Sequence, residues 1–389
     1  MLSFENTQVA FANKSDKDLK KANFIFSILG IPWLNILGTK LTTLALFLRL
    51  PVKGIIKFTV FDHFCGGESI EECETRIQEL AKYNVKTILD YSVEGKQSDE
   101  DFDRCLGMAV SSIERAKLDD NVPCCVIKLT GLIPFNLLEK VTAKQTLSDE
   151  ENTEFLKGRN RVDIICQNAY NAGIPLMIDA EESWIQDAID DIALLMMFRY
   201  NKEKTIVYNT AQMYRHDRLE YIKKLYIQCL EEDFYLGMKL VRGAYMEKER
   251  ERALKMGYPS PIHADKEATD RDYDLGVSFC MDSYQRIALC AGTHNEKSSS
   301  HLCQLIEEKG LSKDTPSIYF SQLLGMSDHI SYNLSKAGYN VSKYVPYGPV
   351  NDVMPYLIRR AEENSSIAGQ TGRELRLIQK ELERRKAMN

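Results

Sequence analysis

Residues 174–210 read IPLMIDAEESWIQDAIDDIALLMMFRYNKEKTIVYNT, and they hold two strand patterns with one helix pattern between them. Ile174–Ala180 and Thr205–Thr210 are short apolar runs that contain β-branched residues, which is typical of buried strands. Glu182–Tyr200 carries its apolar residues at helical spacing. A strand, a helix and a second strand in this order predict two parallel strands joined by a helix.

The same alternation of strand and helix patterns extends along the chain in both directions. Further strand patterns lie at Val85–Tyr91, Cys124–Thr130, Tyr235–Val241, Arg286–Thr293, Ser317–Gln322 and Val341–Pro346. Helix patterns lie between them, among them Asp99–Lys117, Ser148–Asn171 and Arg215–Glu231. Ser148 and Glu151 fit a capping box, and Gly173 fits the end of the same helix. Eight strands alternating with helices predict an α/β fold of the (βα)8 TIM-like barrel type.

The regions outside the strand patterns predict two helical additions to the barrel. We expect an N-terminal helical arm over residues 1–80, the barrel over 81–366 and a C-terminal helix over 367–389. Thr371 and Glu374 fit the cap of that last helix.

The N-terminal arm contains one long apolar stretch, Phe24–Leu50. It is interrupted by Pro32, Asn35, Lys40 and Arg49. A helix that crosses a membrane needs about 20 consecutive apolar residues. We therefore expect a packed helical arm, with shallow membrane contact as the alternative.

Charge and composition disfavour several classes of protein. The 389-residue chain has a net charge of −6 and no block of basic residues, which disfavours nucleic acid as a partner. The ten cysteines form no CxxC pair, so we expect free thiols in a reducing compartment. The six histidines form no HExxH motif, so we expect no metal site. No GxGxxG follows a strand pattern, so a flavin or nucleotide would bind at the mouth of the barrel.

Polar side chains stand at the carboxyl ends of most strand patterns, where the reacting groups of such barrels lie. They are Lys128, Asp179, Glu181, Asn209, Gln212, Lys239, Arg242, Thr293, His294, Gln322 and Tyr344. Taken singly, each of them is equally well explained as a strand cap or a loop contact. Because polar groups beside an apolar barrel are costly unless they are paired or used, the whole set favours a functional site.

Residues 344–366 read YVPYGPVNDVMPYLIRRAEENSS and predict a strand end followed by a helix. Asn351 or Asp352 fits the N-cap, and Pro355 then falls in the first turn, where its missing N–H does least harm.

Two adjacent arginines, Arg359 and Arg360, lie in the middle of this helix beside apolar residues. Such a pair suits the binding of a carboxylate or a phosphate, because the guanidinium fork matches both groups. The alternative is a solvated basic face on which Arg359 pairs with Glu363.

The sequence of residues 344–366 closely resembles the C-terminal signature of the proline dehydrogenase family. Six further segments match the family in order: VIKLTG at 126–131, MIDAEES at 177–183, YNTAQMY at 208–214, KLVRGAYMEKER at 239–250, THNE at 293–296 and FSQLLGM at 320–326. The resemblance implies a (βα)8 barrel that holds FAD and oxidises L-proline to Δ1-pyrroline-5-carboxylate. It also implies hydride transfer to flavin N5 and electron transfer to a quinone.

The resemblance also implies roles for residues that bind the substrate. Arg359 and Arg360 match the clamp for the proline carboxylate, and Lys128 matches a basic residue near the substrate. Tyr344 matches a tyrosine that packs on the proline ring. The hydroxyproline-oxidising branch has a smaller residue there, so bulky Tyr344 favours proline, with hydroxyproline as the alternative.

Two residues match catalytic positions of the family, the acidic Asp179 and the basic Lys239 close to flavin N5. Many bacterial members have arginine at the second position, so Lys239 departs in shape but not in charge. Lys128 and Asp179 are expected to form one titrating network. The flavin-contacting positions are matched by Gln212, Arg242, Gly243, Ala244, Thr293 and His294. The small side chains of Gly243 and Ala244 would let the backbone approach the cofactor.

The resemblance implies L-proline as substrate, a membrane quinone as electron acceptor and a separate pyrroline-5-carboxylate dehydrogenase. We expect a cytoplasmic protein, with peripheral contact at the inner face of the membrane as an alternative. Two other classes of protein are alternatives, a metal-dependent barrel hydrolase and an inactive regulatory or membrane-anchoring module. The hydrolase is disfavoured because His294 is the one histidine at a predicted strand end.

Overall fold

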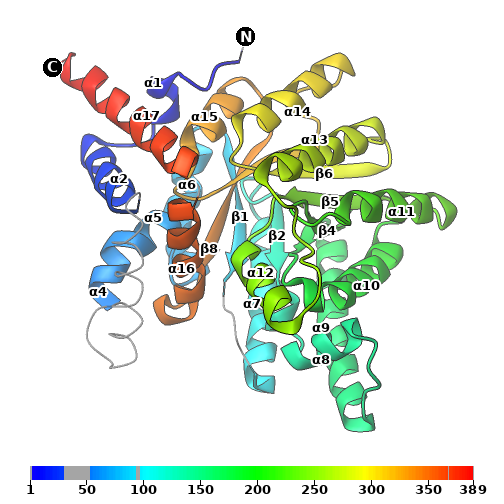
Figure 1. Ribbon diagram of the computed structural model, residues 1–389. Helices are drawn as coiled ribbons and strands as arrows, with labels where there is room; N and C mark the ends of the chain where they lie inside the picture. Colours follow the sequence, from blue (N-terminus) through cyan, green and yellow to red (C-terminus); the bar gives the residue numbers. More distant parts are fainter. Residues whose placement is uncertain (1, 30–52, 93–96, 367, 389) are drawn as a thin grey trace. The chain divides into compact units, whose positions relative to one another are not determined.

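The computed structural model describes residues 2–29, 53–92, 97–366 and 368–388. Eight strands follow one another in chain order around a closed barrel, and the pairs that join β1 through β7 are parallel (Figure 1). Their bounds are β1 Val85–Tyr91, β2 Cys124–Ile127, β3 Leu176–Ile178, β4 Val207–Gln212, β5 Leu236–Val241, β6 Ile287–Gly292, β7 Ile318–Leu323 and β8 Val341–Tyr347. The predicted (βα)8 barrel is confirmed.

Helices follow the strands along the chain. They are α7 Asp99–Lys117, α8 Phe135–Thr142, α9 Asp149–Ala172, α10 Ser183–Tyr200, α11 Arg218–Glu231, α12 Met246–Met256, α13 Lys266–Asp282, α14 Glu296–Glu308, α15 Asp328–Lys336 and α16 Val350–Ser366. The capping box predicted for α9 is present: the Glu151 amide donates to the Ser148 hydroxyl at 3.2 Å, and the Ser148 amide donates to the Glu151 carboxylate at 3.1 Å. Gly173 ends the helix in the left-handed conformation, with φ +71°.

Two strands are several residues shorter than their sequence patterns. β3 covers Leu176–Ile178 of the pattern Ile174–Ala180. β2 ends at Ile127, whereas the pattern continued to Thr130. Leu129–Gly131 forms a turn of 3₁₀-helix, in which the Thr130 amide donates to the Glu181 carboxylate at 3.1 Å. The Thr130 amide thus bonds to a side chain and not to a neighbouring strand. Its partner, Glu181, is 51 residues away in sequence.

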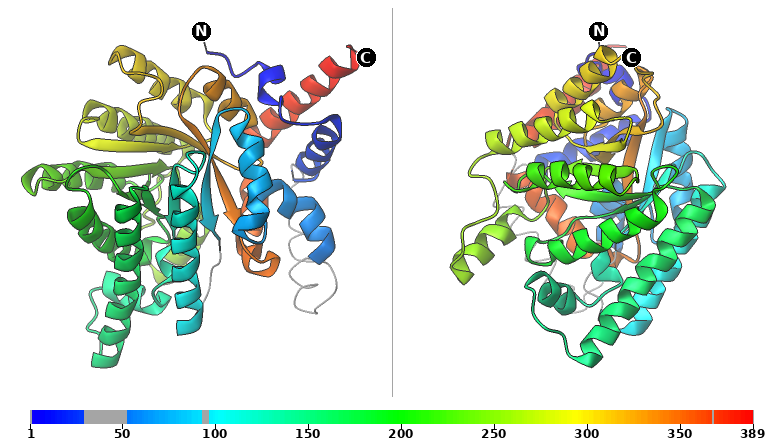
Figure 2. Two further views of the ribbon diagram at one scale, coloured as in Figure 1. Left: turned by 180° about the vertical axis from the view of Figure 1, so that it is seen from behind. Right: turned by 90° about the vertical axis from the view of Figure 1, so that its right-hand side faces the viewer.

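The chain divides into two compact units. Ile88–Ser321, here called the barrel unit, contains most of the strands. In this unit α7 packs beside α9, and α8 packs beside α10 (Figure 2).

The terminal unit comprises Met1–Thr87 and Gln322–Asn389. Besides α15 and α16 it holds α1 Thr7–Ala10, α2 Asp16–Leu29, α4 Lys53–Ile56, the π-helix η1 Lys57–Phe61, α5 Asp62–Phe64, α6 Ile70–Ala81 and α17 Ala368–Lys386. The C-terminal helix α17 lies beside α1 and α2 (red and blue in Figure 1). Phe11 and Phe26 pack there against Leu377 and Ile378.

The described part of the N-terminal arm is therefore a set of packed helices. Most of the apolar stretch Phe24–Leu50 falls in residues 30–52, which lie outside the described residues. In the part of the chain that the structure describes, no helix combines the length and the apolar character needed to cross a membrane.

Two predicted helix starts are wrong. α16 begins at Val350, so Asn351 and Asp352 lie in its first turn and Pro355 lies inside the helix. The Pro349 carbonyl accepts the amides of Asp352 and Val353 at 2.8 and 3.1 Å, which starts the helix earlier than a cap at Asn351 would.

α17 likewise begins at Ala368, so the predicted cap by Thr371 and Glu374 falls within the helix. Glu374 does not cap its own helix. Its buried carboxylate accepts the Ser327 amide at 2.5 Å, a contact that joins α17 to the loop before α15.

Candidate active site

Four charged side chains form a continuous chain in the barrel unit. Asp90 lies at the end of β1, Lys128 and Asp179 directly follow β2 and β3, and Lys239 lies in β5. Lys128 Nζ donates to both carboxylate oxygens of Asp90 at 3.0 Å and lies 3.3 Å from Asp179 Oδ2. The other oxygen of Asp179 accepts a hydrogen bond from Lys239. The charges thus alternate from carboxylate to ammonium along four strands.

This alternation is what makes the burial of the four groups tolerable. Asp90 is 1% exposed and Lys239 is 5% exposed, so each would be strongly destabilising as an isolated charge. Two carboxylates and two ammonium groups sum to no net charge. Loss of any one member would leave a buried charge with too little compensation.

Two cysteine thiols, Cys290 and Cys124, lie close to Lys239 in the barrel unit. Burial raises the pKa of the Cys290 thiol to about 12, although the neighbouring Lys239 opposes this rise. Burial likewise raises the pKa of Cys124 well above its usual value. Both thiols therefore stay protonated at neutral pH, so neither adds a negative charge beside Lys239.

Asp90 is the member that sequence reasoning missed. It lies within the strand pattern Val85–Tyr91, from which no site residue is predicted. A carboxylate near the end of an apolar strand is the same signal that marked Asp179, and it would have identified Asp90. The Ser92 hydroxyl also donates to this carboxylate.

Arg242 is the centre of a second polar group in the barrel unit. Its Nε donates to Asp270 at 2.7 Å, and its other two nitrogens donate to the hydroxyls of Thr293 at 2.6 Å and Ser298 at 2.9 Å. The guanidinium carbon lies 4.3 Å from the centre of the Tyr273 ring. Burial would raise the pKa of Asp270, but hydrogen bonds from Lys266 and Arg242 lower it, so the carboxylate is ionised at neutral pH. Arg242 is thus a fixed cation, joined directly to Thr293.

Gln212, Gly243 and Ala244 form a third set. Gln212 accepts the Ala244 amide at 3.2 Å and donates to the Glu181 carbonyl at 2.6 Å. Gly243 has φ +134°, and a Cβ there would lie 2.6 Å from the Tyr214 ring. Glycine is therefore required at position 243 by the protein itself, apart from any bound group.

The remaining predicted residues are placed as follows. His294 is half-buried and directly follows Thr293. Tyr344, on β8, is half-buried in the terminal unit. On α16 of the same unit, Arg359 is half-buried, and Arg360 is 6% exposed with its guanidinium 5.2 Å from the Tyr356 ring centre. Burial of Arg360 does not fit a solvated basic face.

Asn209, one of the polar residues predicted at strand ends, contacts two helices of the barrel unit, α10 and α11. Its amide donates to Asp190 and to the Tyr221 hydroxyl, both at 2.9 Å. Arg218 pairs with the same Asp190 at 2.7 Å. Asn209 thus joins a strand to helices, as the alternative of a structural role predicted. Among the described residues, no group of histidine, cysteine, aspartate or glutamate is arranged to hold a metal.

The sequence profile of one family, described as proline dehydrogenase, matches residues 73–373. The chain belongs to the proline dehydrogenase family. All seven segments quoted above for the resemblance lie inside the matched residues, and membership makes the chain an oxidoreductase.

Individual relatives resemble the chain over most of its length. Proline dehydrogenase 2 of Arabidopsis thaliana, named as mitochondrial, is 33% identical over 85% of this chain and 79% of its own. Hydroxyproline dehydrogenase of Xenopus laevis is 29% identical over 99% of this chain and 90% of its own.

Solved structures agree with the barrel. Proline utilization A of Bdellovibrio bacteriovorus superposes with a TM-score of 0.69 at 19% identity and covers 92% of this chain. The chain spans 38% of the length of that protein. This likeness concerns the proline dehydrogenase fold alone.

Proposed function

We propose that this protein oxidises L-proline to Δ1-pyrroline-5-carboxylate, with FAD as hydride acceptor and a quinone as the final electron acceptor. The observation that carries the proposal is the alternating chain of Asp90, Lys128, Asp179 and Lys239 in a member of the proline dehydrogenase family. A separate pyrroline-5-carboxylate dehydrogenase would consume the product.

The donor set of the barrel unit fits a flavin. Gln212, Arg242, Thr293 and His294 offer an amide, a cation, a hydroxyl and an imidazole, while the ring system of FAD presents carbonyl and nitrogen acceptors. When bound, FAD supplies the hydride acceptor. Lys239 and Arg242 are fixed cations whose charge would favour negative charge on such a ring.

Substrate binding would depend on residues of the terminal unit. Arg359 and Arg360 supply adjacent guanidinium groups, which bind a carboxylate through charge-assisted hydrogen bonds. Tyr344 would pack on the ring of the substrate. These residues fix orientation, so their contribution is catalysis by positioning.

The charged chain would act on the proton of the substrate amine. Hydride leaves the ring carbon next to nitrogen, and the amine must be neutral for this step. A fixed ammonium at Lys128 disfavours a second positive charge close by and so favours the neutral amine. We assign the released proton to solvent and not to a single base, because Lys128 and Asp179 are already paired with each other and with Asp90 and Lys239.

Hydroxyproline is the second candidate substrate, because the Xenopus relative that covers 99% of this chain bears that name. The bulk of Tyr344 favours proline. Tyr344→Ser would enlarge the space at this position and should raise the reactivity of 4-hydroxyproline relative to proline.

The test is the visible absorbance spectrum of the purified protein before and after anaerobic addition of L-proline. We expect a flavin spectrum that bleaches with L-proline and much less with 4-hydroxyproline. Preferential bleaching by 4-hydroxyproline would establish the second candidate. A protein that neither carries FAD nor takes it up on reconstitution would refute the proposal.

A further inference from the structure

A short segment of the N-terminal arm, Cys65–Glu68, runs along the joint between β8 and α16; we call it the strap. The Gly66 amide donates to the Pro346 carbonyl at 2.8 Å, and the Gly67 carbonyl accepts the Gly348 amide at 3.1 Å. Gly67 also forms a parallel bridge with Tyr347. The strap therefore extends the pairing of β8 at the point where the chain turns into α16.

The sequence of the strap is suited to this close approach. A Cβ at Gly66 would lie 2.6 Å from a methyl carbon of Val345, and one at Gly67 would lie 2.4 Å from Cβ of Glu72. A larger residue at Gly66 would push the strap away from β8, and one at Gly67 would collide with α6, so both glycines are needed for the position of the strap.

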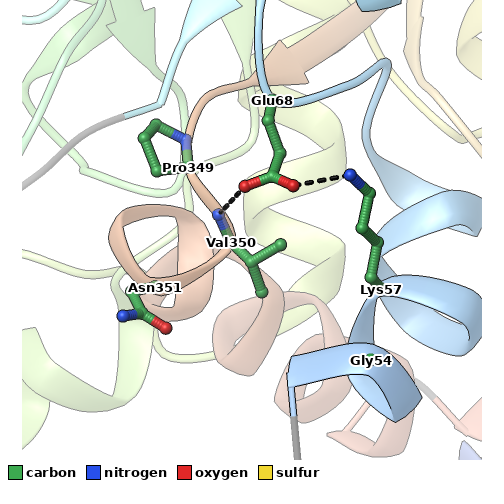
Figure 3. A pocket seen from close by; sticks show the side chains of 6 residues that line it. All are labelled: Gly54, Lys57, Glu68, Pro349, Val350 and Asn351. Carbon is green, nitrogen blue, oxygen red and sulfur yellow. Dashed lines mark hydrogen bonds and ion pairs between the residues drawn. The ribbon is translucent and has the colours of Figure 1, made fainter.

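Glu68, the last residue of the strap, joins it to the first turn of α16. One carboxylate oxygen accepts the Val350 amide at 3.3 Å, and the other accepts from Lys57 Nζ at 2.6 Å (Figure 3). Pro349, which precedes the helix, has no side-chain acceptor for this amide. Glu68 supplies the missing cap from a distant part of the chain, and its negative charge suits the positive end of the helix.

The N-terminal arm also packs against the apolar face of α16. Phe61 ends the π-helix that Lys57 begins, and Phe61 and Phe64 belong to the same buried cluster as Val353 and Leu357 of α16. One short element therefore provides both the Lys57 ion pair and the apolar contact. The first turn of α16 is held from two sides.

We infer that Glu68, held by Lys57, is a positioning residue for the substrate: it fixes the first turn of α16 and thereby the direction of Arg359 and Arg360. Those arginines lie about two to three turns further along the same helix, so a tilt at its start is carried to them. The inference rests on the proposed function, in which the arginines bind the substrate carboxylate.

The exposure of the ion pair separates this role from simple stabilisation. The side chains of Lys57 and Glu68 are 47% and 35% exposed. Exposed ion pairs of this kind contribute little to global stability. Loss of the pair should therefore change the orientation of α16 more than it changes the unfolding of the protein.

The test compares Glu68→Gln and Lys57→Met with wild type in the full-length, FAD-loaded protein. Both variants break the ion pair that holds the Glu68 side chain at the start of α16, so the KM for L-proline should rise by about three- to tenfold while kcat stays within about twofold. FAD content and melting temperature should stay at wild-type values. Glu74→Gln is the matched control, because Glu74 accepts from Gln78 within α6 and should leave every value unchanged.

A second measurement does not depend on catalysis. Amide hydrogen exchange of residues 350–354 in the absence of proline should be faster in Glu68→Gln than in wild type or in Glu74→Gln. An unchanged KM in both strap variants would overturn the inference, whatever the exchange rates. A parallel loss of kcat, FAD and melting temperature would also overturn it, because the strap would then be merely structural.

Failure of the proposed function would look different. A wild-type protein whose flavin is not reduced by L-proline would refute the proposed substrate before any variant is compared. The exchange measurement would then still decide whether Glu68 holds the start of α16.

Discussion

Lys128 donates to both carboxylate oxygens of Asp90 at 3.0 Å, although the two residues lie on different strands and are 38 positions apart in the chain. Asp90 is the inner end of a chain of charges that continues through Asp179 to Lys239. The cluster has no net charge while both carboxylates are ionised. Asp90 supplies one of the two negative charges, and its side chain is less exposed to solvent than those of the other three residues.

Asp90→Asn should change the pH dependence of proline oxidation. The substitution gives the cluster a net positive charge, which disfavours a protonated substrate amine more strongly than wild type does. We expect the acidic limb of the kcat/KM profile to move to lower pH by about half a unit to one unit. We also expect the free energy of unfolding to fall by about 1–3 kcal/mol, because Lys128 loses a buried partner.

The control for this substitution is Glu220→Gln, which removes an equal charge from an exposed ion pair in the same unit. It should leave both the profile and the stability unchanged. An Asp90→Asn profile that superposes on wild type would contradict an electrostatic effect on the amine.

Arg359→Ala and Arg360→Ala should each weaken proline binding by about 1.5–3 kcal/mol, the range for a hydrogen bond to a charged group. FAD content should not change, since the proposed flavin contacts lie in the barrel unit. Anaerobic titration of flavin reduction measures the binding, with Arg104→Ala as an exposed control. Wild-type affinity in both variants would rule out the carboxylate clamp.

The strands were predictable from sequence because burial inside a parallel barrel imposes short apolar runs, and local composition records this directly. β1 has the predicted bounds Val85–Tyr91. β2 is shorter because Glu181 binds Thr130, and no local pattern contains that contact.

Most residues of the candidate site could be predicted from sequence, but their contacts with one another could not. Lys128, Asp179 and Lys239 stood out as polar residues at strand ends, whereas their common link to Asp90 depends on which strands are neighbours. The cap of α16 shows the same limit. Asn351 looked like the cap because it is local, while the acceptor is Glu68, 282 residues away in sequence.

Gly243→Ala should impair both folding and flavin retention. The residue has φ +134°, which disfavours any side chain, and the new Cβ would lie 2.6 Å from the Tyr214 ring. We expect the free energy of unfolding to fall by about 1–3 kcal/mol and FAD content to drop. Gly257→Ala is the matched control, because Gly257 also has positive φ but has open space around it. Equal losses in both variants would show that Tyr214 plays no part.

Glu374 should impose an unusual pH dependence on stability. Burial raises its pKa to about 7, with His329, Asp328 and Lys343 as the nearest charged or titratable groups. Between the ordinary value of 4.5 and about 7, the folded protein binds more protons at this site than the unfolded chain does. The contribution of Glu374 to the free energy of unfolding therefore falls as pH rises through this window, by up to about 3 kcal/mol.

His63 has the opposite effect on stability at lower pH. Burial lowers its pKa to about 3, so below its ordinary value of 6.5 the unfolded chain binds more protons there. Its contribution to stability rises as pH increases toward 6.5 and then levels off. The contributions of His63 and Glu374 to the free energy of unfolding change in opposite directions from pH 4.5 to 6.5. The loss of stability due to Glu374 should therefore be clearest just above pH 6.5.

Glu374→Gln separates the two effects, because glutamine keeps an oxygen that accepts the Ser327 amide but cannot ionise. The variant should gain stability as pH rises to about 6.5 and then stay level, whereas wild type should decline toward pH 8. Urea unfolding at intervals from pH 5 to pH 8 measures this, and Glu383→Gln, exposed on the same helix, should behave as wild type. If wild type and Glu374→Gln show parallel curves above pH 6.5, Glu374 titrates at its ordinary value and its burial is compensated by the contacts around it.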